Sequence, residues 1–393
     1  MIPDRKIDVN RARAETPGVD HVTHFNNAGA ALIPLPVLDA VTGHLHLEAR
    51  IGGYEAEEEA AGAVARTYDA VAALLNCRRD EVAIVENATV GWDMAFYGLA
   101  QTFTAGDRIL TSMAEYSSNY IPFLQVARRT GAVIEAVPND RHGQLDVDAL
   151  AGMIDERVRL IAITHIPTNG GLVNPAADVG RIARRHGIPY LLDACQTAGQ
   201  MPIDVEEIGC DMLSATGRKF LRAPRGTGFL YVRKDLLERL EPPFLDNHAA
   251  TWVAPDRYEI NADGRRFENW ESNIAAKIGL GVAVDYALGW GLDAIWERVR
   301  GLGDLLRSRI AGLPGFTVRD LGEVRCGIVT FTGPRPPAET KALLSDHGIN
   351  VSITKAASTL LDMDARGLTE MVRASVHYYN TEDEIDRLVE ALS

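Results

Sequence analysis

The stretch Pro189-Tyr-Leu-Leu-Asp-Ala-Cys-Gln196 is a short apolar run that ends in a carboxylate. A run of this kind, bounded by turn residues, is typical of a strand buried on both faces of a parallel sheet. In doubly wound sheets, ligands bind at the carboxyl ends of the strands. Asp193 therefore stands where it could either cap a helix or pair with a cation of a bound ligand, and the local pattern leaves both possibilities open.

Similar apolar runs occur on both sides of this stretch. We expect strands at Val82–Val85, Arg108–Ser112, Ala132–Val137, Leu160–His165, Pro189–Asp193 and Gly228–Val232. Helical patterns separate several of them, from about Thr89, from Asn119 to Arg129 and from Pro175 to His186. Strands that alternate with helices predict an α/β fold with a mostly parallel central sheet.

The pattern changes in the last third of the chain. Two long helices are expected first, followed by shorter strands and helices: Ile274–Tyr286, Leu292–Ile310, Cys326–Thr332, Pro337–His347, Met371–Tyr378 and Glu382–Ala391. We therefore predict a large domain over residues 20–275. A smaller C-terminal α/β domain would be formed by residues 1–19 and 276–393.

The composition excludes several classes of protein. The 393 residues include 40 Lys and Arg against 54 Asp and Glu, a net charge of −14, which disfavours nucleic-acid and anionic-membrane partners. The four cysteines form no CxxC pair and no zinc-ligand spacing, so we expect no metal and a reducing compartment. No apolar run reaches the ~18 residues of a membrane span. Met1–Lys6 lacks the apolar core of a secretory signal, and a cytoplasmic location is expected.

One of the six lysines stands apart from the others. Five lie in charged or helical surroundings and are expected at the surface: Lys6, Lys234, Lys277, Lys341 and Lys355. Lys219 lies in Ser214-Ala-Thr-Gly-Arg-Lys-Phe-Leu-Arg-Ala-Pro224, a segment without helical or strand period. A lysine held in a tight loop can have a lowered pKa and act as a nucleophile. An exposed loop lysine would fit the same pattern.

A turn that could bind phosphate follows the strand expected at Val82–Val85. Glu86-Asn-Ala-Thr-Val90 places Thr89 where a helix begins, and free amides at a helix start suit a phosphate. A plain threonine N-cap is the alternative interpretation. Together, a phosphate turn, an aspartate at a strand end and a loop lysine are the groups that a pyridoxal phosphate site needs.

With these residues in place, the sequence resembles the class V aminotransferase family of the fold-type I pyridoxal phosphate enzymes. That family includes cysteine desulfurases, selenocysteine lyases and isopenicillin N epimerase-like proteins. The motifs that carry the resemblance occur in the family's order: His24–Ala30, Asn87–Thr89, Gly106–Asp107 with Glu115–Asn119, Asp193–Gln196, Thr216–Lys219, Arg225–Gly228 and Arg373–Asp386. The resemblance implies pyridoxal phosphate as cofactor, an amino-acid substrate and a homodimer, with no nucleic-acid or membrane partner.

The resemblance also implies a role for each matching residue. Lys219, Asp193 and Tyr116 are the expected catalytic residues: the Schiff-base lysine, the partner of the pyridine nitrogen and the ring that stacks on the cofactor. Further cofactor contacts are expected from Ala88, Thr89, Thr168, Gln196, Thr216 and Arg218. Thr227 is expected to reach the phosphate bound by the partner subunit. Arg373 is expected to bind the substrate α-carboxylate, and Asn27 is expected to contact the substrate as well.

The choice of reaction depends on where the sequence departs from the family. Cysteine desulfurases need a mobile cysteine in the stretch that corresponds to Val351–Arg366, and this stretch contains none. Tyr116 and Thr168 also stand where those enzymes have His and Asn. We therefore predict an enzyme acting at the Cα of an L-amino acid, an aminotransferase first. A C–S (β-elimination) lyase or an amino-acid epimerase is the alternative, and a persulfide-forming cysteine desulfurase is not expected.

The sequence is less consistent with two hypotheses from other classes of protein. A nicotinamide-binding domain would carry GxGxxG after its first strand, and none stands there. A cofactor-free structural dimer on this fold would tolerate the loss of Lys219 or Asp193, and both are present.

Overall fold

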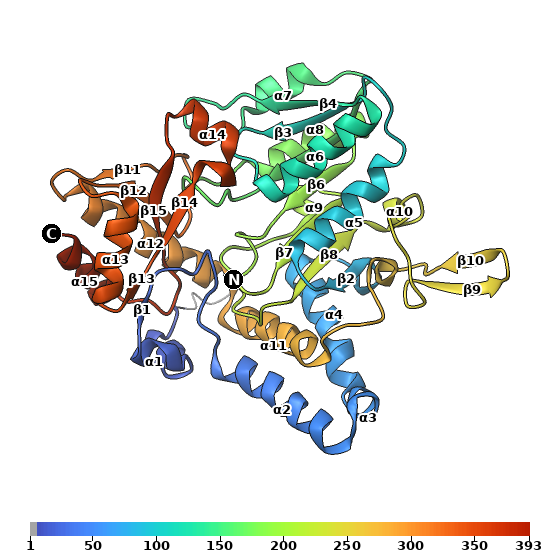
Figure 1. The fold of residues 1–393 in the computed structure, drawn as a ribbon, viewed down its shortest axis with the longest axis horizontal. Helices are drawn as coiled ribbons and strands as arrows, with labels where there is room; N and C mark the ends of the chain where they lie inside the picture. The colour runs from blue at the N-terminus through green and yellow to red at the C-terminus, as the bar shows by residue number, and fades with distance from the viewer. Residues whose placement is uncertain (1–5) are drawn as a thin grey trace.

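The computed structural model describes residues 6–393, and its centre is a seven-stranded sheet (Figure 1). Its order is β2-β8-β7-β6-β5-β3-β4, and its strands are β2 (Val82–Val85), β3 (Arg108–Ser112), β4 (Val133–Val137), β5 (Val158–Thr164), β6 (Tyr190–Asp193), β7 (Met212–Thr216) and β8 (Gly228–Val232). Strand β8 runs antiparallel to both neighbours, and the other pairs are parallel. The predicted α/β fold with a mostly parallel sheet is confirmed.

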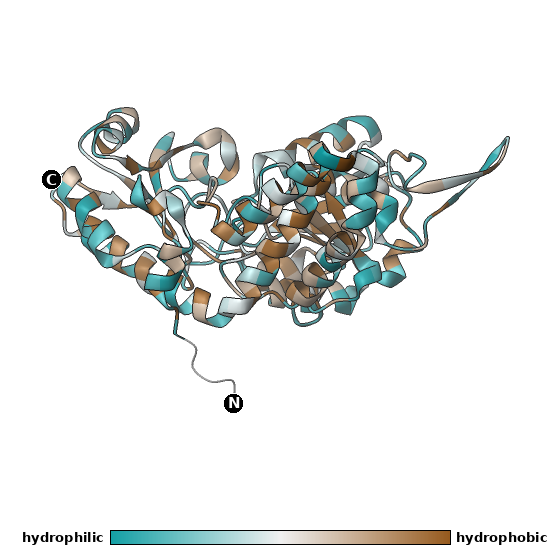
Figure 2. Ribbon diagram, turned by 90° about the horizontal axis from the view of Figure 1, so that it is seen from below, coloured by the Kyte–Doolittle hydropathy of each residue, from teal (hydrophilic) through white to brown (hydrophobic). Residues whose placement is uncertain are grey.

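Helices cover both faces of this sheet, so its strands are buried on both faces. Along β5, Leu160 and Ala162 join one apolar cluster while Ile161 and Ile163 join the other. Each fully buried side chain of this size contributes about 1.5–3 kcal/mol, and Figure 2 shows the resulting apolar centre. The helices of this part are α2 (Leu35–Ile51), α3 (Gly53–Glu59), α4 (Ala61–Leu75), α5 (Ala88–Ala100), α6 (Ser117–Thr130), α7 (Val147–Met153), α8 (Ala176–His186), α9 (Val205–Ile208), α10 (Lys234–Leu237) and α11 (Ile274–Trp290).

A smaller antiparallel sheet lies beside the central one, in the order β11-β12-β15-β14. Its strands are β11 (Thr317–Val318), β12 (Ile328–Thr332), β14 (Ser352–Lys355) and β15 (Glu370–Ser375). The helices of this part are α12 (Leu292–Ala311), α13 (Pro337–Asp346), α14 (Leu360–Ala365) and α15 (Glu382–Leu392). Short 3₁₀ turns complete the chain at Pro17–Asp20, Arg79–Glu81, Gly264–Phe267 and Ala356–Ser358.

The first part of the chain pairs with the last. After α1 (Val9–Ala14), strand β1 (Thr23–His24) runs parallel to β13 (Ile349–Asn350), and Asn26 bridges to Ser375. Arg13 also forms an ion pair of 2.8 Å with Glu384 on α15. Residues 1–5 of the predicted small domain, and most of the Met1–Lys6 segment expected to be no secretory signal, lie outside the described residues.

A two-stranded hairpin that the sequence analysis did not predict projects from the molecule. Strands β9 (Ala250–Ala254) and β10 (Arg257–Ile260) pair antiparallel, and the hairpin extends away from the central sheet in Figures 1 and 2. Trp252 on β9 is 79 % exposed. Within residues 6–393, no single helix is long and apolar enough to cross a membrane, and α11 with α12 meets that test only as a pair bent by 79°.

Candidate active site

The strand register brings the predicted motifs to one edge of the central sheet. At the ends of β5, β6 and β7, Thr164 pairs with Asp193, and Asp193 pairs with Ser214. Because β8 runs against its neighbours, its first residue, Gly228, lies at the same edge, beside Thr216 and Val85. The phosphate turn, the strand-end aspartate and the lysine loop therefore start from β2, β6 and β7, whose ends lie at the same edge of the sheet.

The phosphate turn is shaped by the start of α5. Asn87 is its N-cap, and its side-chain oxygen accepts a hydrogen bond from the Val90 amide at 3.0 Å. The alternative interpretation of Thr89 as the N-cap is therefore wrong. Ala88 and Thr89 lie in the first turn, where backbone amides lack helical partners and are available to an anion. A Cβ at Gly228 would lie 3.1 Å from the Ala88 nitrogen, so only glycine lets β8 approach this turn so closely.

Lys219 lies in the loop after β7 and is half-buried. Among the ion pairs of residues 6–393, none involves this lysine. Burial is the main cause that lowers the pKa of its amine, and the charges of Arg218 and Arg373 lower it further. Cys195 and Asp193 act in the opposite direction. The amine is thus shifted toward its neutral, nucleophilic form.

The lysine loop is braced by residues from the C-terminal part of the chain. Arg222 is buried with a φ of 62°, a strained backbone for a non-glycine residue. Its guanidinium donates to the Tyr378 hydroxyl at 2.8 Å. His377 Nε2 lies 2.9 Å from the Phe220 carbonyl and donates to it in the matching tautomer. These contacts on both sides of the loop fix the position from which Lys219 acts.

Asp193 is 4 % exposed and is held from two directions. Its Oδ1 accepts from the Cys195 amide at 2.8 Å, and its Oδ2 accepts from Asn119 Nδ2 at 2.9 Å. No ion pair within residues 6–393 neutralises it. Nearby, Gln196 Nε2 donates to the Ala28 carbonyl at 3.1 Å, while its buried Oε1 has no partner in the described chain. These unpaired polar groups fit a bound ligand that carries a cation and hydrogen-bonding groups.

Arg373 on β15 is buried, although no carboxylate pairs with it in the described residues. Its Nη1 donates to the Thr168 hydroxyl, and its buried Nε has no partner there. Burial lowers the pKa of Arg373 to about 10, Tyr116 opposes this shift, and Arg218 adds to it. A buried guanidinium without a counter-ion fits an anionic ligand such as a carboxylate. Thr168 faces this arginine, and its contact with the cofactor ring stays a prediction.

Four other predicted residues make hydrogen bonds within the chain. The Thr216 hydroxyl donates to the Thr227 carbonyl at 3.3 Å, and the Thr227 hydroxyl donates to the Pro224 carbonyl at 2.7 Å. Arg218 donates to the Gly29 carbonyl. The fourth residue is Asn27.

Asn27 is completely buried, and its amide is already used. Its Nδ2 donates to the Ser375 carbonyl at 2.7 Å, and its oxygen accepts from the Tyr379 hydroxyl. These bonds join the N-terminal segment to β15. The contact of Asn27 with a substrate stays a prediction.

The sequence analysis included Glu115 and Asn119 in a motif of the resemblance but assigned a role to neither residue. Asn119 Nδ2 lies 2.8 Å from Glu115 Oε1 as well as 2.9 Å from Asp193. Their spacing of four residues, at the start of a predicted helix, is the signal that could have placed them together.

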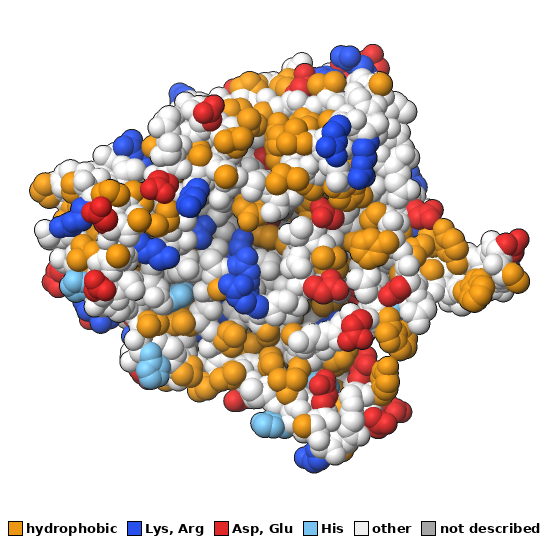
Figure 3. All heavy atoms as spheres, viewed as in Figure 1, with side chains coloured by type: hydrophobic (Ala, Val, Ile, Leu, Met, Phe, Trp, Pro, Cys, Tyr) orange, Lys and Arg blue, Asp and Glu red, His pale blue; other side chains and the backbone are white. Residues whose placement is uncertain are grey.

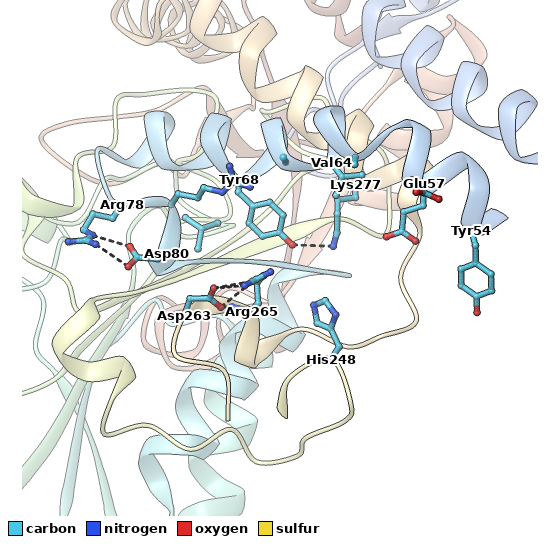
Figure 4. Close-up of a pocket in the computed structure, with 15 residues that line it drawn as sticks. Tyr54, Glu57, Val64, Tyr68, Arg78, Asp80, His248, Asp263, Arg265 and Lys277 are labelled. Carbon is cyan, nitrogen blue, oxygen red and sulfur yellow. Dashed lines mark hydrogen bonds and ion pairs between the residues drawn. The ribbon is translucent and has the colours of Figure 1, made fainter. Parts of the chain in front are cut away.

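A pocket of about 970 Å³ lies away from these residues, beside Lys277 on α11 (Figure 4). The figure shows the Lys277 amine directed at the Tyr68 hydroxyl, 3.4 Å away. Lys277 is only 7 % exposed, so its expected surface position was wrong. It is buried because α11 packs against both α2 and α4.

The surface in Figure 3 shows where charge gathers. Lys and Arg side chains cluster near the middle of this face, in the hollow between the small sheet and the central sheet, while acidic side chains gather toward α3 and α4. A basic hollow in a chain of net charge −14 favours anionic ligands. In residues 6–393, no group of three or more His, Cys, Asp or Glu could hold a metal ion.

Comparison with known proteins places this site in a family. Residues 23–388 match the family model "Aminotransferase class-V". A probable cysteine desulfurase of Xylella fastidiosa is 34 % identical over 403 residues, covering 99 % of this chain and 96 % of the relative. The chain therefore belongs to the class V aminotransferase family of pyridoxal phosphate enzymes, and the predicted cofactor is confirmed.

Solved structures agree with this assignment. A cysteine desulfurase of Escherichia coli superposes with a TM-score of 0.92 at 25 % identity, covering 98 % of each chain. An apo cysteine desulfurase of Thermococcus onnurineus gives a TM-score of 0.91 at 26 % identity, covering 98 % of this chain and 96 % of that one. The relatives' names conflict with the expectation that this chain is not a desulfurase. This chain has no cysteine in Val351–Arg366, the stretch in which a desulfurase was expected to carry its mobile cysteine.

Proposed function

We propose that the protein uses pyridoxal phosphate to act at the Cα of an L-amino acid. The observation that carries this proposal is the buried guanidinium of Arg373, which has no carboxylate partner in the described residues and whose charge lowers the pKa of the half-buried Lys219. Arg373 binds the substrate carboxylate and thereby fixes the amino acid in one orientation. The neutral amine of Lys219 takes the proton from Cα as a base and then returns it as an acid.

The cofactor supplies an electron sink for the charge that develops at Cα. Ala88, Thr89, Thr216 and Arg218 would hold its phosphate at the start of α5. Asp193 would pair with its pyridine nitrogen, Tyr116 would stack on its ring, and Gln196 and Thr168 would bind the ring oxygen. The amides of the α5 start support this arrangement. The unpaired Oε1 of Gln196 could accept a hydrogen bond from the ring oxygen when that oxygen carries a proton.

Transamination is the first reaction that we propose for this site. Without a cysteine in Val351–Arg366, the site lacks a mobile thiol that could accept sulfur there. Cys326 is completely buried and close to the start of β12, so it cannot move to a substrate. C–S bond elimination is the second candidate, because the relatives named above are cysteine desulfurases. Epimerisation at Cα would use the same two residues.

A visible absorption spectrum during titration with L-amino acids tests the proposal. Absence of a cofactor band, even after pyridoxal phosphate is added, would contradict it. Conversion of the band with release of a keto acid identifies a transaminase. A lasting band with accumulation of ammonia and pyruvate or a thiol fragment identifies a lyase. Alanine and sulfide from cysteine would identify a desulfurase and overturn our choice.

The carboxylate assignment has its own test. Arg373→Met removes a charge-assisted pair worth about 1.5–3 kcal/mol, so KM for the amino acid should rise about 10- to 100-fold. Arg373→Lys keeps the charge but loses the fork, and should recover only part of the affinity. An unchanged KM in both variants would show that the carboxylate binds elsewhere.

We further propose that two copies associate, and that the chain works as domains of residues 20–275 and of 1–19 with 276–393. On α2, Leu35, Leu38 and Leu45 are exposed along one face, which supports burial against a second copy. Thr227 lines a small pocket with Asn269 and Ser272, from which it could approach the partner's phosphate. Sedimentation of the wild type and of Leu38→Glu tests this: a monomeric wild type would contradict it.

A further inference from the structure

Glu115, one residue before Tyr116, is a buried carboxylate to which the proposed function gives no task. It is 3 % exposed, and its oxygens accept five hydrogen bonds. Its Oε1 accepts from the Thr164 hydroxyl at 2.6 Å, from Asn119 Nδ2 at 2.8 Å and from the Tyr116 amide at 3.0 Å.

The second oxygen of Glu115 is held as firmly as the first. Oε2 accepts from the Thr164 amide at 2.9 Å and from the Thr111 hydroxyl at 3.1 Å. These donors lie on β3, β5 and α6 and are all uncharged. No ion pair in residues 6–393 neutralises Glu115. A buried carboxylate without a counter-ion is costly to ionise, so a ligand cation nearby would stabilise the charged form of Glu115.

Asn119 connects this carboxylate to Asp193. The two hydrogens of its Nδ2 point to Glu115 Oε1 at 2.8 Å and to Asp193 Oδ2 at 2.9 Å. The amide cannot turn over, because its oxygen would then face two carboxylates. With the Cys195 amide on the other oxygen of Asp193, at 2.8 Å, the orientation of that carboxylate is fixed.

The two carboxylates also interact through their charges. Burial raises the pKa of Glu115 to about 7, the hydrogen bonds from Thr164 and Asn119 lower it, and the charge of Asp193 raises it. The pKa of Tyr190 on β6 is raised by burial first, then by the charges of Cys210 and Glu115. A cation placed against Asp193 would relieve the repulsion between the two carboxylates.

We propose that Glu115 is a positioning residue: through Asn119 it orients Asp193 and favours a protonated pyridine nitrogen against that carboxylate. This inference rests on the proposed function. Glu115 does not touch the ligand itself and acts only through Asn119 and through its charge.

Two single variants test the proposal through cofactor binding and the visible spectrum. Glu115→Gln and Asn119→Ala should each weaken the binding of pyridoxal phosphate to the apoprotein about tenfold, the loss expected for one hydrogen bond to a charged group. The pH midpoint of the bound cofactor's visible band should move to lower pH in Glu115→Gln, because a negative charge that favours the protonated form is gone.

Thr111→Val is the matched control, since it removes one buried donor to Glu115 and leaves both carboxylates in place. It should lower the melting temperature while leaving the cofactor affinity and the band midpoint near those of the wild type. A double variant, Glu115→Gln with Asn119→Ala, should lose less cofactor affinity than the sum of the two single losses, because the part of the Glu115 effect that passes through Asn119 is lost only once.

The outcomes separate this inference from the proposed function. A wild type that takes up no cofactor overturns the proposed function. A wild type that binds cofactor normally, with Glu115→Gln identical to it in affinity and in band midpoint, overturns the inference alone. Additive losses in the double variant also contradict it. If Glu115→Gln does not fold, Asn119→Ala decides the matter, because it breaks the link and keeps both charges.

Discussion

Lys219 and Lys277 are both shielded from solvent, but the charges around their amines are opposite. Lys277 is 7 % exposed, with its amine 3.5 Å from Glu268 and 3.4 Å from the Tyr68 hydroxyl. Lys219 is half-buried at the sheet edge, with the charges of Arg218 and Arg373 near it and no carboxylate in an ion pair. One lysine has a counter-ion and the other has additional positive charge beside it.

The difference teaches that burial alone does not make a lysine reactive. Glu268 accepts from the Ile84 amide and from the Tyr68 hydroxyl, each at 2.8 Å. Although burial works against ionisation, hydrogen bonds and the Lys277 charge keep the pKa of Glu268 below its ordinary value. That carboxylate balances the charge on Lys277. Lys219 lacks such a partner, so folding favours its neutral form, which is the form that attacks and takes protons.

The largest expected effect is on catalysis. Lys219→Ala should lower turnover about 10²- to 10⁴-fold, the contribution of a positioned acid–base group, and should also remove the visible band of the lysine-bound cofactor. Lys277→Met is the control and should keep both. If the Lys219→Ala variant turned over substrate at the wild-type rate, Lys219 would not be the acid–base group, and the different surroundings of the two lysines would have no effect on catalysis.

A smaller effect is expected on stability at the other lysine. Lys277→Met leaves Glu268 buried without its cation, and breaking a buried pair costs about 3 kcal/mol. Urea unfolding should report this loss, and the double variant Lys277→Met with Glu268→Gln should recover much of it. A double variant as unstable as the sum of its two single variants would show that the two residues do not act as a pair.

The smallest expected effect is on the stability of the apoprotein, and here the substitution stabilises the protein instead of destabilising it. Lys219→Met should stabilise the apoprotein at pH 7 by about 1 kcal/mol, since it removes a charge that folding disfavours. The pKa of Lys219 lies below its ordinary value of 10.5 in the folded protein, so the unfolded chain holds this proton more tightly. The loss of unfolding free energy caused by the charged Lys219 is complete below the pKa that Lys219 has in the folded protein. It disappears as the pH rises from that pKa to 10.5.

Unfolding curves of the Lys219→Met variant and the wild type between pH 7 and pH 10 measure this change. The gap in unfolding free energy between the two proteins should narrow as the pH rises. A gap that widens with pH would mean that Lys219 is held in its charged form.

The fold could be predicted where strands carry continuous apolar runs. The bounds of β2, β3 and β8 were predicted correctly, and their side chains are nearly all buried. Strand β7 (Met212–Thr216) was missed because it contains serine and threonine at positions that are all buried. A central strand covered on both faces shows no alternation, so the sequence offers no period to detect.

The site was predictable where a motif is local, and not where it depends on distant contacts. Asp193 ends an apolar run, so the sequence alone placed it at the end of a strand. Lys219 was predicted as a loop lysine, but the strand that carries it to the sheet edge, β7, was missed. Glu115 gains its role from β5 and β6, far away along the chain. Lys277 lies on a helix that looks half-exposed, and only the packing of α2 and α4 against α11 buries it. None of these contacts leaves a signal in neighbouring residues.

The pairing of the first residues with the last has a consequence for biosynthesis. Asn27 and Ser375, joined by a hydrogen bond, are 348 positions apart, and β1 must wait for β13 before it has a partner. Contacts of such long separation form late and slow the search for the native topology. The central sheet can assemble while the ribosome is still extending the chain. The part of the site around Arg373 on β15 is therefore completed late, and until β13 has formed the N-terminal segment has no strand to pair with.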